Sequence, residues 1–219
     1  MIKSKEWDWN KTKDDLWLKP SEDVFFILNN WGNRGFKIFL DLGAGMGRHS
    51  ILFAQYGFTV YSADLSEKSI KNISEKASNM NLNITPIKCD MIELPYDDNF
   101  FDCLLAYNVI SHTDTDGVKK CLKEMCRVIK KGGEAFFTIG CKESSYFKNY
   151  TGKWLDENTI IKLEEGPEIY VPHFYADINT LIELLKNFII INVRQIKNIN
   201  FNNLNNYTWH YFIHVRKDF

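Results

Sequence analysis

The sequence lacks three features that would assign it to a common class at once. None of its five cysteines forms a C-x-x-C pair, and most stand inside apolar runs, which is typical of reduced core residues. No apolar run approaches the ~18 residues that a membrane span requires, and the first residues contain no apolar signal segment. Neither charge is in excess, since 27 basic residues face 28 acidic ones. We therefore expect a cytoplasmic protein with no membrane partner and no general affinity for nucleic acid.

Short apolar runs alternate with amphipathic stretches through the middle of the 219-residue chain. Strands that alternate with helices form a parallel sheet with helices on both of its faces. Two β-rich runs near the end of the chain have no helix between them, so we expect them to pair antiparallel. The predicted strands are 36–41, 58–63, 84–89, 101–107, 134–140, 188–196 and 208–217, and the predicted helices are about 47–57, 66–80, 115–130 and 177–187, with another that begins near Ser21.

A glycine-rich turn lies between the first of these strands and the helix that follows it. It runs from Asp41 to Gly47 with glycines on alternate positions, 43, 45 and 47. Glycine permits positive φ and close approach of a ligand to the backbone, and the amides at a helix N-terminus attract electron-rich groups. The turn therefore predicts a nucleotide or nucleoside site. A dinucleotide site remains open on this feature alone, although its glycine spacing is G-x-G-x-x-G.

Ligands of open α/β sheets bind at the carboxyl ends of the strands, and two further carboxylates lie there. Asp64 ends the second strand, where it could accept both hydroxyls of a ribose or simply cap the next helix. Asp90 ends the third strand, where it could accept from an exocyclic amine while Met91 packs on a purine, or be an exposed turn residue.

These pieces together resemble a class I S-adenosylmethionine-dependent methyltransferase of the small-molecule "type 11"-like group. The resemblance covers about 36–140 and rests on the Asp-Leu-Gly-x-Gly-x-Gly turn, the acid after strand two, Asp90–Tyr96 with its Leu-Pro-Tyr end, Phe101-Asp102, and the turn 128–133 before strand five. It implies a doubly wound, mostly parallel seven-stranded sheet with an antiparallel last strand. The Tyr107-Asn108 segment lacks the Asn/Asp-Pro-Pro-aromatic signature of enzymes that methylate nucleic-acid amines.

The resemblance also implies S-adenosylmethionine as cofactor and S-adenosylhomocysteine as product. The glycine turn with Asp41 would hold the methionine part, Asp64 the ribose, and Asp90 with Met91 the adenine. We expect no metal site. The predicted cofactor-binding residues are Asp41, Gly43, Ala44, Gly45, Gly47, Asp64, Leu65, Asp90, Met91, Tyr107 and Asn108.

The acceptor is predicted less closely than the cofactor. We expect a small molecule, with a protein or RNA acceptor, or a non-catalytic cofactor-binding protein, as alternatives. His112 and His173 are candidate general bases, although each could equally be a surface or packing residue. Trp17, Lys19 and Tyr175 are candidates for the substrate side. The acceptor atom and the oligomeric state, monomer or homodimer, stay open.

Two aromatic segments, 1–31 and 141–176, show little periodicity. We expect them to contain no sheet elements and to fold as a lid over a mostly apolar acceptor pocket, with a side cluster or a dimer contact as the alternative. The whole chain is expected to be a single domain with a cap and helix (1–35), a cofactor-binding core (36–140), a lid-like insertion (141–176) and a terminal helix with a strand pair (177–219).

Overall fold

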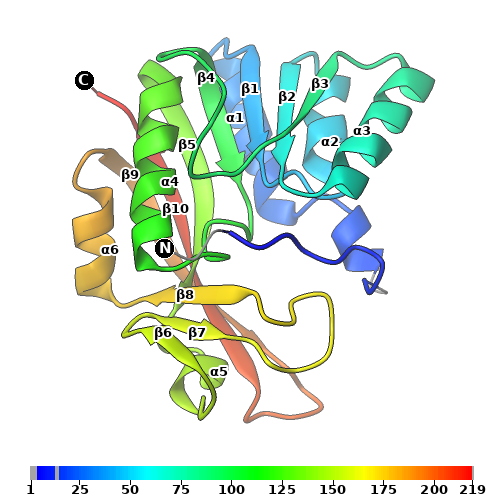
Figure 1. The fold of residues 1–219 in the computed structure, drawn as a ribbon. Coiled ribbons are helices and arrows are strands. Elements are labelled where there is room, and N and C mark those ends of the chain that lie inside the picture. Colours follow the sequence, from blue (N-terminus) through cyan, green and yellow to red (C-terminus); the bar gives the residue numbers. More distant parts are fainter. Residues whose placement is uncertain (1–3, 13–14, 219) are drawn as a thin grey trace.

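The chain folds around one twisted sheet, as a computed structural model that describes residues 4–12 and 15–218 shows (Figure 1). Residues 1–3 and 13–14 of the predicted cap lie outside the described part. The strands are β1 (Ile38–Leu42), β2 (Thr59–Asp64), β3 (Ile84–Lys88), β4 (Phe101–Ala106), β5 (Ile129–Cys141), β6 (Trp154–Asp156), β7 (Thr159–Ile161), β8 (Pro172–Ala176), β9 (Ile189–Ile199) and β10 (Tyr207–Arg216). The helices are η1 (Asp15–Leu18), α1 (Glu22–Asn33), α2 (Arg48–Gln55), α3 (Glu67–Met80), α4 (Thr115–Val128), α5 (Ser145–Lys148) and α6 (Ile178–Leu185).

The main part of the sheet has the strand order β3-β2-β1-β4-β5-β10-β9. The first five of these strands run parallel, β10 runs antiparallel to β5, and β9 runs antiparallel to β10. This confirms the predicted doubly wound sheet with its antiparallel terminal pair. The order reverses between β1 and β4, and this switch point places the ends of β1, β2 and β4 beside one crevice.

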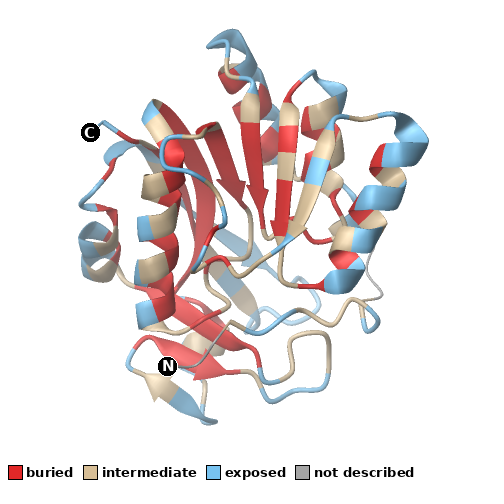
Figure 2. Cartoon of the chain, turned by 45° about the horizontal axis from the view of Figure 1, so that its top comes forward, coloured by how far each residue is buried: buried red, intermediate tan, exposed pale blue. Residues whose placement is uncertain are grey.

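The central strands of the sheet consist largely of buried residues (Figure 2). Helices α4 and α6 pack on one face, and α1 and α2 pack on the other. Trp31 of α1 is fully buried beside the stacked rings of Phe39 and Phe53, and its indole nitrogen donates a 2.8 Å hydrogen bond to Glu134 of β5. The lid prediction is therefore wrong for α1, because its periodic apolar face belongs to the core.

The insertion 141–176 forms three short strands, which contradicts our expectation that it holds no sheet elements. β8 pairs parallel with the end of β5 at Gly140 and Tyr175, and β7 and β6 extend the sheet antiparallel beyond it. The sheet therefore has ten strands among the described residues, where we predicted seven. Strands of three residues, as in β6 and β7, are too short to show an alternating pattern. Within the described residues, no helix is long and apolar enough to cross a membrane.

Candidate active site

The glycine turn after β1 adopts the backbone that its residues predict. Gly43 and Gly45 have φ of +69° and +55°, which is left-handed backbone. A Cβ atom at Gly43 would lie 2.2 Å from Cγ2 of Val109, and one at Gly45 would lie 2.6 Å from Cζ2 of Trp9. Both positions therefore require glycine for conformation and for space. The amide of Gly43 donates a 2.7 Å hydrogen bond to the carbonyl of Ala63, so the turn is held against the end of β2.

Asp64 lies directly beside this turn. Its carboxylate accepts hydrogen bonds from the amides of Gly45 (2.7 Å) and Ser66 (2.8 Å), which orient it toward the crevice. Burial raises the pKa of the Asp64 carboxyl, and the hydrogen bonds from the Ser66 and Gly45 amides oppose this rise. A carboxylate fixed between two amides can accept hydrogen bonds from a ligand with little loss of side-chain entropy.

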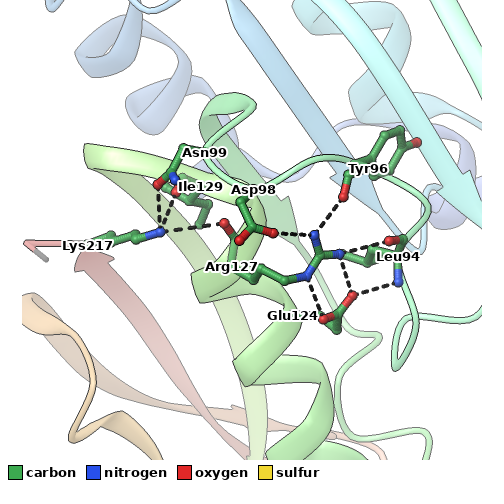
Figure 3. Close-up of polar contacts among 8 residues, drawn as sticks. All are labelled: Leu94, Tyr96, Asp98, Asn99, Glu124, Arg127, Ile129 and Lys217. Atoms are coloured by element: carbon green, nitrogen blue, oxygen red, sulfur yellow. Dashed lines mark hydrogen bonds and ion pairs between the residues drawn. The ribbon is translucent and has the colours of Figure 1, made fainter.

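Asp90 stands on the loop that joins β3 to β4, and Arg127 of α4 holds this loop (Figure 3). The guanidinium of Arg127 donates to the carbonyls of Leu94 (2.9 Å) and Tyr96 (2.7 Å), and it pairs with Glu124 at 2.7 Å. Glu124 in turn accepts from the amide of Leu94 at 2.8 Å. These bonds fix the Leu-Pro-Tyr end of the segment that begins at Asp90.

The ends of β1, β2, β3 and β4 enclose a pocket of about 850 Å³, part of it open to solvent; we call it the cofactor pocket. Its walls include the glycine turn and both carboxylates, Asp64 and Asp90, together with residues of the N-terminal segment. Predicted site residues that line it are Gly43, Ala44, Gly45, Asp64, Leu65, Asp90, Met91, Tyr107, Asn108, Trp17 and His112.

Three predicted residues line neither this pocket nor the neighbouring pocket that is described next. Asp41 is 1% exposed, lies beneath the turn and accepts a 2.6 Å hydrogen bond from the hydroxyl of Ser50, so it ties β1 to α2. Gly47 faces α3, where a Cβ would lie 2.7 Å from Cγ1 of Ile73. The side chain of Lys19 is exposed, and its carbonyl accepts from Arg48 at 3.2 Å. For these three residues, a place in the motif or at a strand end predicts that the residue lies near the pocket. It does not predict where the side chain points.

A second pocket of about 990 Å³, part of it open to solvent, adjoins the first; we call it the acceptor pocket. Trp7, Trp17, Asn108 and His112 line both pockets, so they form the boundary between the two. His173 and Tyr175 of β8 line the acceptor pocket, as do Lys162, Glu168 and His210. The two candidate histidines are therefore brought together, although they come from distant parts of the chain. The pocket holds charged side chains, in contrast to the mostly apolar one that we predicted.

His112 and His173 meet at the carboxylate of Glu168. Oε1 of Glu168 lies 3.2 Å from Nε2 of His173 and 3.8 Å from Nε2 of His112. Burial and the neighbouring His173 lower the pKa of His112 to about 3. Burial also lowers the pKa of His173, against the hydrogen bond with Glu168. At neutral pH the two imidazoles are therefore uncharged.

Several residues of these pockets escaped the sequence analysis. Arg48 lines the cofactor pocket at the start of α2, with its guanidinium carbon 5.3 Å from the ring centre of Trp17. Lys162 and Glu168 stand in a segment to which we assigned no element. Arg48 follows the glycine turn directly and could have been found from its place at the helix start. Nothing in the sequence points to Lys162 or Glu168.

Comparison with known proteins agrees with this geometry. Residues 39–133 match the family model of a methyltransferase domain. The chain is 36% identical over 107 residues to malonyl-[acyl-carrier protein] O-methyltransferase of Buchnera aphidicola, an alignment that covers 49% of the chain and 41% of the relative. It is 30% identical over 107 residues to tRNA (carboxymethyluridine(34)-5-O)-methyltransferase of Arabidopsis thaliana, with 48% and 24% covered. The chain thus spans less than half the length of these two relatives.

A crystal structure of a SAM-dependent methyltransferase from Methanosarcina mazei has the same fold. It superposes with a TM-score of 0.74 at 20% identity, and the alignment covers 92% of this chain and 99% of that one. The chain therefore resembles S-adenosylmethionine-dependent methyltransferases in its strand order, in its glycine turn with two carboxylates, and in the methyltransferase domain that residues 39–133 match.

Proposed function

We propose that this protein transfers the methyl group of S-adenosylmethionine to a nucleophile of a small molecule. The observation that carries the proposal is the acceptor pocket, which adjoins the cofactor pocket and shares four residues with it. Its walls come from the N-terminal segment, the ends of β4 and β5, and the β6–β8 extension, in keeping with one domain working as a whole. A pocket walled on so many sides favours a small acceptor over a folded macromolecule.

The residues of the cofactor pocket suit the three parts of the cofactor. The turn 43–46 would lie under the methionine part, and the Arg48 guanidinium would pair with its carboxylate. Asp64 would accept from the ribose hydroxyls, and Asp90 would accept from the adenine amine while Met91 packs on the ring. The chemistry of these side chains, which line one pocket, supports these roles.

Methyl transfer is an in-line displacement, so most of the catalysis should come from positioning. The acceptor would enter from the acceptor pocket and meet the sulfonium methyl near His112, which stands on the boundary. His112 and His173 are our candidates for activating an acceptor that carries a proton. Tyr175 and Trp17 would contact the body of the acceptor.

An RNA or protein acceptor is the second candidate, since one relative is a tRNA methyltransferase. The net charge of −1 gives no general attraction for RNA, which favours the small molecule.

The test uses S-adenosylmethionine with an isotopically labelled methyl group. The protein is incubated separately with small-molecule extract, total RNA and total protein, and label should appear only in the small-molecule fraction. Label in RNA or protein alone would overturn the proposed acceptor class. Calorimetry should show binding of S-adenosylhomocysteine without competition by NADH at equal concentration, and absence of binding would falsify the cofactor assignment.

A further inference from the structure

Three potential metal ligands converge in the acceptor pocket. Nε2 of His112, one carboxylate oxygen of Glu168 and one ring nitrogen of His173 all lie within 4.8 Å of one another. Ligands about 2.1 Å from a common ion, at the angles of tetrahedral to octahedral coordination, lie about 3.0–3.5 Å apart. The observed separations from Glu168 Oε1, 3.2 Å to His173 and 3.8 Å to His112, are close to that range.

The hydrogen bond that Nδ1 of His173 makes determines which ring nitrogen can bind a metal ion. Nδ1 lies 3.0 Å from the carbonyl oxygen of Val171, and a carbonyl can only accept, so Nδ1 carries the hydrogen. Nε2 then faces the Glu168 carboxylate, with Oε1 at 3.2 Å. A proton on Nε2, or a metal ion bound between the two atoms, would satisfy this contact. A metal-binding histidine ordinarily has this arrangement, with its second nitrogen donating to a backbone carbonyl.

The surrounding backbone fixes the three ligands relative to one another. The amide of Phe174 donates a 2.8 Å hydrogen bond to the carbonyl of Ser111, and these residues are the chain neighbours of His173 and His112. The amide of Val171 donates to the carbonyl of Glu168 at 3.0 Å. Lys162 pairs with Oε2 of Glu168, which leaves Oε1 to face the histidines. The cluster is therefore ordered without help from a ligand.

We propose that His112, Glu168 and His173 bind a divalent first-row transition-metal ion, such as zinc, whose open coordination positions face the acceptor. Two imidazoles and one carboxylate suit zinc, iron, cobalt or manganese better than calcium or magnesium. This departs from our expectation of no metal site. For catalysis the inference rests on the proposed function, whereas metal binding itself needs neither cofactor nor acceptor.

The bound ion would activate an acceptor hydroxyl. The hydroxyl coordinates the ion and releases its proton to solvent at a lowered pKa. The oxygen's electron pair then forms the bond to the methyl carbon, and the electron pair of the breaking carbon–sulfur bond returns to sulfur. The products are the methyl ether or ester and S-adenosylhomocysteine. His112 and His173 would then act as ligands, and neither would take the proton.

The test titrates cobalt(II) into the full-length, tag-free, metal-free protein and follows the visible absorption of bound cobalt, without cofactor. One equivalent should bind with absorption typical of nitrogen and oxygen ligands, and zinc should displace it while magnesium at equal concentration should not. Glu168→Gln, which keeps the shape of the side chain, and His173→Ala should each weaken binding roughly 100-fold, whereas His210→Gln, in the same pocket but outside the cluster, should change it less than about threefold.

Each contrary outcome overturns the inference. Absence of saturable absorption would mean that the cluster holds no metal, and unchanged affinity in Glu168→Gln would place the metal elsewhere. An equal loss in His210→Gln would show that the ligand set is wrong. Circular dichroism of each variant separates lost ligands from lost fold. A protein that binds cobalt but not S-adenosylhomocysteine would refute the proposed function and leave the metal site standing.

Discussion

The cofactor pocket and the acceptor pocket are built in different ways. The first lies where β1, β2, β3 and β4 end beside one another, and the glycine turn and the loops after these strands form much of its wall. The second is made by side chains from distant segments of the chain, namely the N-terminal residues, the loop after β4, the end of β5, the region from α5 to β8, and the start of β10. Strand order and glycine spacing determine the position of the cofactor pocket, whereas the shape of the acceptor pocket depends on how irregular segments pack. The variants below test whether this division holds.

The largest expected effect concerns Asp41, a motif residue that lies outside the cofactor pocket. Burial raises the pKa of Asp41 from 3.8 to about 6. The folded protein then binds more protons than the unfolded chain between these values, so the Asp41 contribution to stability falls as pH rises from about 4 to 6 and stays low above that. Asp41→Asn removes this dependence and should gain up to about 3 kcal/mol over wild type across the window.

Denaturant unfolding of both proteins at pH 4 to 7 checks this prediction. Asp102→Asn is a control that should change stability in the opposite direction. Although partial burial opposes it, hydrogen bonds from Lys130 and from the amides of Ile38 and Lys37 lower the pKa of Asp102, so its loss should reduce stability at pH 7. Calorimetry should find cofactor affinity little changed in Asp41→Asn. A large loss of affinity would show that Asp41 serves the ligand after all.

Asp64 should give the largest loss of cofactor affinity. Asp64→Ala removes a charge-assisted acceptor from the ribose and should weaken binding of S-adenosylhomocysteine by about 1.5–3 kcal/mol. Asp97→Ala, an exposed acid outside the cofactor pocket, should leave the affinity unchanged. Isothermal titration calorimetry measures both, and equal effects would refute the ribose assignment.

Trp17 stands between the two pockets and should affect turnover more than stability. Its ring centre lies 5.2 Å from that of Trp7, and both rings line the acceptor pocket. Trp17→Ala should reduce kcat/KM roughly tenfold, the scale of a lost aromatic contact in a binding site, with little change in Tm. Trp154→Ala is the matched control, since Trp154 lines neither pocket. A similar loss in both variants would contradict the assignment.

The smallest effect is a change of mobility. If the N-terminal segment and the 141–176 insertion close over bound ligand, S-adenosylhomocysteine should slow hydrogen exchange in both, while α6 (Ile178–Leu185) should not respond. Mass spectrometry of peptides from the three segments measures this. Exchange that is indifferent to the ligand in the first two segments would mean that they form a fixed wall rather than a lid.

Most of the main sheet could be predicted because its signals are local. Apolar runs and amphipathic stretches of ordinary length mark β1 to β5 and their helices, and the glycine turn orders them around one site. The β6–β8 extension could not be predicted, since its pairing with the end of β5 depends on contacts across the chain. Asp102 shows a further limit, because this motif residue binds the amides at the start of β1, away from the site.

The same distinction between local and long-range signals applies to the candidate site. Asp64 and Asp90 were predicted from strand ends, and both line the cofactor pocket. His112 and His173 were predicted singly, but their meeting at Glu168 was not, because no short motif joins ligands so far apart in the chain. Sequence spacing therefore identifies groups held by one turn, and it misses groups that tertiary packing brings together.

The burial of Trp31 has a consequence for the segment that precedes α1. The indole hydrogen bond to Glu134 holds α1 firmly to β5, and the amide of Ser21, just before α1, donates a 3.3 Å hydrogen bond to His49 of α2. The N-terminal residues are thus tethered within a short reach of the pocket that they cover. This anchor sets the effective concentration of these residues at the pocket, so a change in the packing of the hydrophobic core should alter how the pocket is covered.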